Sequence, residues 1–169
     1  MATGQTLFTL TEFMGSPPTT LGAVQVLRVG GSTPAESYYV WSFTNTAIRY
    51  LDFVYRMPQN YAGGGISCRI NWGAATATSG NCVWEIALRR MADDAEDIDT
   101  SQTYDYNSVT DAAPSAAGEF TDAVITFTNG TDMDSVVAGD TFILRIRRQT
   151  TGNSLSDNAQ LKLIEIRET

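Results

Sequence analysis

The amino-acid sequence of 169 residues contains no histidine. Histidine is the usual general base near neutral pH and the commonest zinc ligand, so its absence excludes Ser-His-Asp and Cys-His catalytic arrangements. Paired carboxylates can still hydrolyse glycosidic bonds, but nothing in the sequence fixes the separation of two acids. We therefore predict that the protein is not an enzyme.

Basic residues are scarce: ten arginines and a single lysine, Lys162, stand against 19 acidic residues. The resulting net charge of −8 at pH 7 is opposite in sign to that of proteins that neutralise phosphates. Nucleic acids and anionic membrane surfaces are therefore not expected as partners.

Long apolar runs are also lacking. No window approaches the ~20 apolar residues that span a bilayer. The opening residues MATGQTLFTL have neither the basic segment nor the long apolar segment of a signal peptide, so we expect synthesis in a cytosol without signal-directed export. With 43% hydrophobic residues, the chain is long enough for one domain with a proper core.

The sequence does contain a series of short alternating segments separated by turn residues, which is typical of an all-β protein. This pattern predicts an antiparallel two-sheet β-sandwich of jelly-roll type, with a single domain over residues 21–169. Within residues 1–20, Pro17 and Pro18 end any regular element. We interpret residues 1–20 as an extended N-terminal arm; a first edge strand is the alternative. The predicted strands cover residues 21–29, 37–44, 48–57, 66–72, 81–90, 119–130, 140–148 and 159–168.

Both cysteines and two of the three tryptophans lie in residues 66–90. Alternation places Cys68 and Trp72 on one face of a first strand. It places Cys82 and Trp84 on one face of a second strand, and the small polar loop between the strands predicts a β-hairpin with its apolar face in the core. A cross-strand disulfide is conceivable, but a cytosolic origin and the frequent burial of free cysteine favour two buried thiols.

An acidic stretch follows this segment. Its carboxylates offer the oxygen ligands that calcium prefers, but they do not match the calcium-loop pattern of an EF-hand. We predict a solvated acidic loop and no cofactor, with calcium binding as the alternative. The residues of the calcium alternative are Asp93, Asp94, Asp97 and Asp99.

Aromatic residues cluster in the first third of the chain, where they could form a surface on which sugars stack. Large aromatic side chains usually fill the core of a sandwich. Tyr38 and Tyr50 are out of phase with their apolar neighbours and are therefore expected to be exposed. The aromatic set consists of Tyr38, Tyr39, Trp41, Tyr50 and Tyr55.

The order of motifs over residues 48–169 resembles a family of small structural proteins of tailed bacteriophages and prophages. The motifs are MPQNYAGGG, INW…ATATSGNCVWEIAL, ITFTNGTDMDSVVAGDTFILRIRR and AQLKLIEIRE. The resemblance implies a virion component and no active site. Its capsid cement or decoration members sit as trimers on the outer capsid surface, which would make the major capsid protein and sister copies the partners. A tail or fibre domain that binds a receptor and a carbohydrate-binding module are the alternatives.

For the cement hypothesis we predict an interface made by the N-terminal arm and an arginine-rich strand face. Under this hypothesis, deletion of residues 2–18 abolishes capsid binding and leaves the domain folded. The predicted interface residues are Leu7, Phe8, Leu10, Phe13, Met14, Arg145, Arg147 and Arg148.

Overall fold

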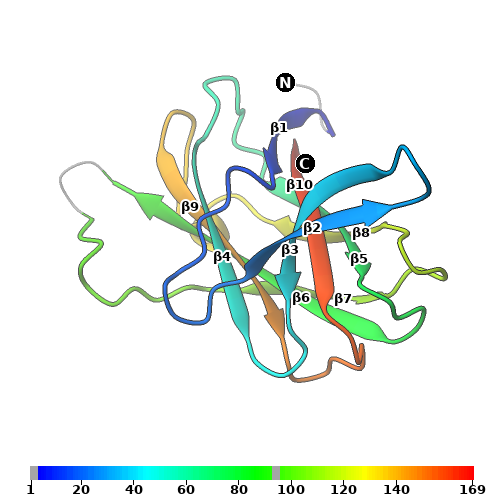
Figure 1. Ribbon diagram of the computed structural model, residues 1–169. Coiled ribbons are helices and arrows are strands. Elements are labelled where there is room, and N and C mark those ends of the chain that lie inside the picture. The colour runs from blue at the N-terminus through cyan, green and yellow to red at the C-terminus, as the bar shows by residue number, and fades with distance from the viewer. Residues whose placement is uncertain (1–3, 93–95) are drawn as a thin grey trace.

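The computed structural model describes residues 4–92 and 96–169, which form ten β-strands and a single turn of 3-10 helix (Figure 1). The predicted all-β fold is confirmed. Within the described ranges, no helix has the length and apolar character needed to cross a membrane. The elements are β1 (Thr6–Thr11), β2 (Val24–Gly30), β3 (Glu36–Phe43), β4 (Arg49–Arg56), β5 (Ile66–Ala74), β6 (Asn81–Met91), β7 (Asn107–Ala112), β8 (Thr121–Phe127), η1 (Thr131–Met133), β9 (Thr141–Gln149) and β10 (Ala159–Glu168).

The strands form two antiparallel sheets that pack face to face as a jelly-roll sandwich. The larger sheet has the order β2-β3-β10-β5-β8, with β1 beside β10 as its sixth strand; the smaller sheet has the order β4-β9-β6-β7. Strand β10 is shared along its length, because its first residues pair with β3 and its last residues pair with β1. The antiparallel two-sheet architecture agrees with the sequence prediction.

The core lies between the two sheets and follows from the two-residue period of the strands. Alternate side chains of β5 and β6 point inward and are buried. Trp84 makes edge contacts with Trp72 and with Phe43, at ring-centroid distances of 5.8 and 5.1 Å. Edge-to-face contacts of this kind add to the free energy gained by burying the rings.

The predicted hairpin of residues 66–90 is wrong. Strand β5 belongs to the larger sheet and β6 to the smaller one, so the link between them crosses from one sheet to the other. Trp72 and Trp84 therefore meet across the sandwich rather than along one sheet. A period of two places the same side chains in the core in either arrangement, which is why the pattern alone could not separate a hairpin from a crossover.

The two cysteines are free and fully buried, as predicted. Burial raises the pKa of the Cys68 thiol and raises that of Cys82 to about 12, and the thiolate is the form that reacts. We expect a thiol reagent such as Ellman's reagent to label neither cysteine in the folded protein and both after unfolding in urea. Labelling of the native protein at the rate of an exposed cysteine would contradict this placement.

The N-terminal residues are a strand of the sandwich rather than an arm lying apart from it. Strand β1 pairs with β10 from Thr6 to Thr11, which is the edge-strand alternative. Phe8 and Leu10 point into the core, where the Phe8 ring stacks on Tyr55 at 4.4 Å between centroids. These two side chains are therefore not available to a partner surface.

Candidate functional site

The β2–β3 hairpin and residues 117–120 enclose an open pocket on the outer face of the larger sheet, which we call the hairpin pocket. Its volume is about 750 Å³. In Figure 1 the hairpin projects to the right, beyond the other strands of its sheet. The pocket is lined by Arg28, Val29, Gly30, Gly31, Ser32, Pro34, Glu36, Tyr38, Ala117, Gly118 and Phe120.

Two aromatic rings from distant parts of the sequence meet in this pocket. Tyr38 comes from β3 and Phe120 from the residue before β8, and their ring centroids lie 5.7 Å apart at an interplanar angle of 60°. The Lys162 ammonium lies 5.0 Å from the centroid of the Tyr38 ring. These contacts hold the Tyr38 ring in place, since a cation near an aromatic face is attracted by the ring quadrupole.

The strand register explains why Tyr38 faces this pocket. Neighbouring side chains of a strand point to opposite faces, and Trp41 of the same strand is buried on the core side. Tyr38 therefore lies on the outer face, where it pairs with Arg28 of β2. The expectation that Tyr38 is out of phase with the core is confirmed.

The polar side chains of the pocket differ in how they are held. The Arg28 guanidinium donates through Nη1 to the carbonyl oxygen of Ala75 at 3.1 Å. This hydrogen bond holds the Arg28 side chain on the outer face of the larger sheet. Glu36 and Ser32 are exposed near the hairpin tip. Gly31 and Gly118 take φ angles of +77° and +86°, in the left-handed region that glycine adopts without strain.

The chemistry of the hairpin pocket suits binding more than hydrolysis. Among its lining residues Glu36 is the carboxylate, whereas glycoside hydrolysis by paired acids needs two. The pocket offers two aromatic rings, a guanidinium, a carboxylate and a hydroxyl on an open surface. Such a set can stack against an apolar ligand face and hydrogen-bond to hydroxyl groups.

The other members of the predicted aromatic set lie elsewhere, so the five residues do not form one surface. The Trp41 indole is buried and donates through Nε1 to the carbonyl oxygen of Glu12 at 2.8 Å. Tyr55 packs against the core, and Tyr50 lies on the outer face of the smaller sheet beside Arg145. The sequence prediction missed Phe120. It lies in the predicted strand of residues 119–130, out of phase with the buried Ile125 and Phe127, but the phase of one strand does not indicate that it lies beside Tyr38.

The predicted arginine face lies on the outer side of β9, where Arg145 and Arg147 make contacts within the chain. Arg145 donates through Nε and Nη2 to the two carboxylate oxygens of Asp52, each at 2.6 Å. This hydrogen bonding to Asp52 raises the pKa of the Arg145 guanidinium. Arg147 forms an ion pair through Nε with a single carboxylate oxygen, Oε2, of Glu85 on the neighbouring strand β6.

A tyrosine pair covers these two arginines. The Arg145 guanidinium carbon lies 4.2 Å from the Tyr104 ring centroid, and that of Arg147 lies 3.7 Å from the Tyr106 ring centroid. Burial raises the pKa of Tyr106 to about 12. Both arginines are thus engaged by ion pairs and rings of their own chain, and an interface role for them stays a prediction.

Arg148 differs from its neighbours, and its predicted place on the surface is wrong. Its side chain points into the sandwich and is 1% exposed. The two Nη atoms donate to three backbone carbonyl oxygens and one side-chain amide oxygen. The acceptors are Phe43 O at 3.0 Å, Asp157 O at 2.6 Å, Leu155 O at 2.7 Å and Asn153 Oδ1 at 3.1 Å.

The remaining predicted interface residues divide into two groups. Leu7 is partly buried against the core. Phe13 and Met14 follow β1 and are exposed, and the Phe13 side chain is 72% exposed. The Phe13 ring makes an edge contact with Tyr39 at 5.6 Å between centroids. An exposed apolar surface therefore does exist next to β1, although it is smaller than predicted.

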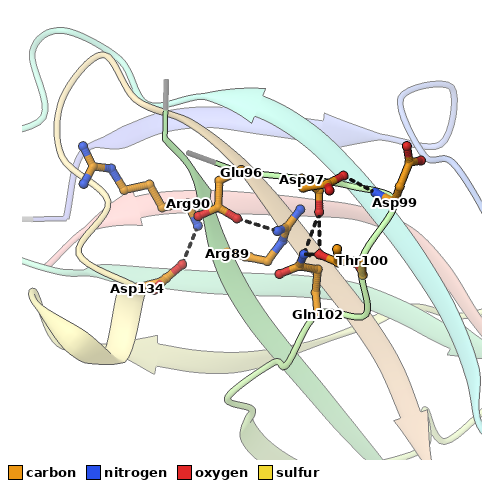
Figure 2. Close-up of polar contacts among 8 residues, drawn as sticks. All are labelled: Arg89, Arg90, Glu96, Asp97, Asp99, Thr100, Gln102 and Asp134. Carbon is orange, nitrogen blue, oxygen red and sulfur yellow. Dashed lines mark hydrogen bonds and ion pairs between the residues drawn. The ribbon is translucent and has the colours of Figure 1, made fainter. Parts of the chain in front are cut away.

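The acidic stretch is held by hydrogen bonds within the chain, as Figure 2 shows. The Asp97 carboxylate accepts from the backbone N–H of Asp99 at 2.9 Å, and Arg89 pairs with Glu96 at 2.8 Å. Two of the four calcium candidates, Asp93 and Asp94, lie outside the described residues. Within the described part of the chain, no group of three or more acidic or cysteine side chains is placed to hold a metal ion.

The sandwich and its pocket define a class of fold, a jelly-roll β-sandwich with an open pocket on one sheet. The fold is similar to the CBM22-2 xylan-binding domain of Paenibacillus barcinonensis Xyn10C, with a TM-score of 0.51 at 11% identity over 96% of this chain and 99% of that chain. It is also similar to the CBM22-1 xylan-binding domain of the same protein, with a TM-score of 0.50 at 10% identity over 99% of this chain and 96% of that chain. The sequence matches no protein-family model and no curated protein at a significant level. At such low identity the similarity shows the fold alone.

Proposed function

We propose that this protein is a carbohydrate-binding jelly-roll domain that binds a polysaccharide without cleaving it. The observation that carries the proposal is the hairpin pocket, in which Tyr38 and Phe120 lie side by side on an open surface of about 750 Å³. Two solved structures with this fold bind xylan according to their names, which supports a sugar polymer as the ligand class.

The pocket supplies both kinds of contact that a sugar ring needs. Sugar rings present an apolar C–H face, which packs on aromatic side chains, and a rim of hydroxyl groups, which need hydrogen-bond partners. Arg28 lies opposite Tyr38 on β2 and supplies a donor, and Glu36 lies two residues before Tyr38 on β3 and supplies an acceptor. Because the pocket is open, a chain of sugars can pass through it without its ends being enclosed.

Replacing Tyr38 by alanine should weaken binding of a short oligosaccharide by about 10-fold or more, since loss of one well-packed aromatic contact costs about 1–3 kcal/mol. The ligand is first identified on an array of plant and bacterial glycans and then titrated by isothermal calorimetry. Phe120→Ala should show a loss of the same order.

The matched control for this prediction is Phe13→Ala, which removes an exposed aromatic ring outside the pocket. It should leave oligosaccharide affinity unchanged. Binding of no glycan by the wild-type chain would refute the proposed function. A wild-type affinity that Tyr38→Ala and Phe120→Ala both leave intact would show that sugar binds at another place.

As a second candidate function, we propose that the domain is a virion component. The resemblance of residues 48–169 to small structural proteins of tailed phages supports this setting, and the exposed apolar ring of Phe13 suits contact with a neighbouring protein. A capsid decoration protein would bind the major capsid protein on the outer capsid surface, as a homotrimer. A tail or fibre domain would use the same hairpin pocket for a host glycan.

The copy number of the chain in purified particles separates these settings. A copy number per particle that matches the number of repeated positions on the capsid lattice would support decoration of the capsid. A far lower copy number would support a place in the tail. Absence of the chain from purified particles would overturn the virion setting while leaving the glycan test untouched.

A further inference from the structure

Strand β2 is an edge strand whose outer side has no partner among the described residues. It pairs with β3 along its whole length from Val24 to Gly30, and it stands at the end of the strand order of the larger sheet. Its outward backbone N–H and C=O groups therefore form a row that another strand can join. Figure 1 shows β2 at the front of the molecule, running out along the projecting hairpin.

Two other edge strands are covered by their own chain. The edge of β4 pairs with the segment before β2, through hydrogen bonds between Ser16 and Asp52 and from Ala23 N–H to the Tyr50 carbonyl oxygen. At the edge of β8, the Asn107 side chain donates to the Thr126 carbonyl oxygen at 2.9 Å. Such coverage protects an edge from pairing with another molecule, and β2 is without it.

The side chains of β2 also differ from those of the remaining edges. Val24, Leu27 and Val29 are 61%, 48% and 62% exposed. The exposed residues of β1 and β7 are instead threonine, serine and alanine. Edge strands are normally protected by lysine, proline or inward-pointing charge, and β2 carries a single charged residue, Arg28, whose guanidinium is bonded to Ala75 on its own chain.

Charge singles out the same region as the place where two copies can approach. The chain carries 19 acidic residues and a net charge of −8, so two copies repel each other over most of their surface. Residues 13–35 contain no aspartate or glutamate and one cation, Arg28. Glu36 of β3 lies opposite Gly30, at the end of β2, so the strand β2 itself carries no negative charge that would keep two copies apart.

We propose that two copies of this chain pair through β2, antiparallel about a twofold axis centred on Leu27. This register is the one that pairs every residue of the seven-residue strand. It places Leu27 opposite Leu27 and Arg28 opposite Val26, so no like charges face each other directly. The two six-stranded sheets would join into one continuous twelve-stranded sheet.

An apolar patch beside the axis adds to the contact. Leu27 pairs with Tyr39 on β3, and the Tyr39 ring contacts the exposed Phe13 ring. The patch of Leu27, Tyr39 and Phe13 on one copy would meet its equivalent on the other near the axis. Burying apolar area of this kind drives association, and it gives the exposed Phe13 ring a partner.

One consequence rests on the proposed function. A twofold axis normal to the sheet leaves the outer faces of both sheets on the same side, so the two hairpin pockets would face one direction. A polysaccharide could then engage both pockets, and linkage of two sites raises apparent affinity without any new contact. Short oligosaccharides would not gain from pairing.

The proposal predicts the mass of the wild-type protein and of two matched variants. Sedimentation at rising concentration should show the 18.4 kDa chain converting to a species of twice that mass. Leu27→Glu should abolish the conversion, because it sets two like charges opposite each other across the axis. Val124→Glu makes the same kind of change at an exposed position of β8 and should leave the dimer intact.

A disulfide trap tests the register itself. Directly opposite residues of an antiparallel pair have Cβ atoms about 4.5–5.5 Å apart, close enough for a disulfide after small adjustment. Leu27→Cys should therefore form a covalent dimer on mild oxidation, whereas Val54→Cys, an exposed position on β4, should not. The native cysteines are buried and do not interfere.

The outcomes are distinct, and the mass measurements need no sugar. A wild-type chain that stays at 18.4 kDa at the highest concentration, with Leu27→Cys no faster to cross-link than Val54→Cys, would overturn the proposal. A species of three copies would support the trimer of the phage family instead and overturn the twofold pairing. A second polypeptide bound to the Leu27 edge would assign that edge to a foreign strand, which also overturns self-pairing. Failure of glycan binding alone would leave the dimer standing.

Discussion

Replacing Arg148 by alanine should lower the free energy of unfolding by about 3 kcal/mol or more, because several buried oxygen atoms lose their hydrogen-bond donor and each such loss costs about 1–3 kcal/mol. The Arg148 side chain is 1% exposed, and its two Nη atoms bond four oxygen atoms. These acceptors come from the end of β3 and from the segment between β9 and β10. The guanidinium thus connects β9, the end of β3 and the segment between β9 and β10. Each buried carbonyl oxygen that is left without a donor costs about 1–3 kcal/mol.

Urea unfolding measures this effect, with Arg56→Ala as the matched control. Arg56 is an exposed arginine on β4 that donates to the Gly139 carbonyl oxygen, and its loss should cost about 1 kcal/mol or less. Arg148→Lys should recover little of the loss, because an ammonium cannot present the planar fork that reaches four acceptors. Equal stability of Arg148→Ala and Arg56→Ala would show that the buried network does not support the fold.

Arg148 also shows where a strand pattern stops being informative. Alternation over residues 140–148 correctly places Leu144 and Ile146 in the core. By the same period Arg148 faces inward, but a charged side chain is expected on the surface because burial of an unpaired charge is costly. This cost is offset by the Phe43 carbonyl and by three acceptors in residues 153–157, shortly after β9. The alternation within β9 contains no signal for these contacts.

The sequence predicted strand positions well where one face is apolar and poorly elsewhere. Eight predicted strands are present with small shifts of their ends. Strand β7 was missed because its exposed residues are small and polar; it lies between the predicted strands of residues 81–90 and 119–130, where the sequence predicted no strand. The assignment of β5 and β6 to different sheets was missed because inward side chains alternate identically in both arrangements.

The candidate site could be predicted only in part. The phase of Tyr38 within β3 indicated an exposed aromatic residue, and the structure places it in the hairpin pocket. Its neighbours Phe120 and Lys162 reach it through the pairing of β3, β10, β5 and β8. Long-range strand order decides these contacts, and it is not encoded in the alternation of any single strand.

Deletion of residues 2–18 should unfold the domain or leave it barely stable, because it removes strand β1 and not a free arm. The deletion takes Phe8 and Leu10 out of the core and leaves the end of β10 paired with β5 alone. Truncation of a buried phenylalanine or leucine to alanine each costs several kcal/mol, whereas a domain is stable by about 5–15 kcal/mol in total. Circular dichroism and urea unfolding of the truncated chain measure the loss.

The point variants Leu10→Ala and Phe13→Ala separate a strand from an arm more sharply than the deletion does. Leu10 is fully buried and Phe13 is 72% exposed, although they lie three residues apart. Leu10→Ala should lower the free energy of unfolding by about 2–5 kcal/mol, and Phe13→Ala by less than about 0.5 kcal/mol. If Leu10→Ala is as stable as the wild type, the N-terminal segment does not belong to the core. A loss of partner binding in the deletion variant would then indicate that the segment is an arm that contacts the partner. If it is destabilised as expected, such a loss reports unfolding, and the search for a partner surface moves to Phe13 and the β2 edge beside it.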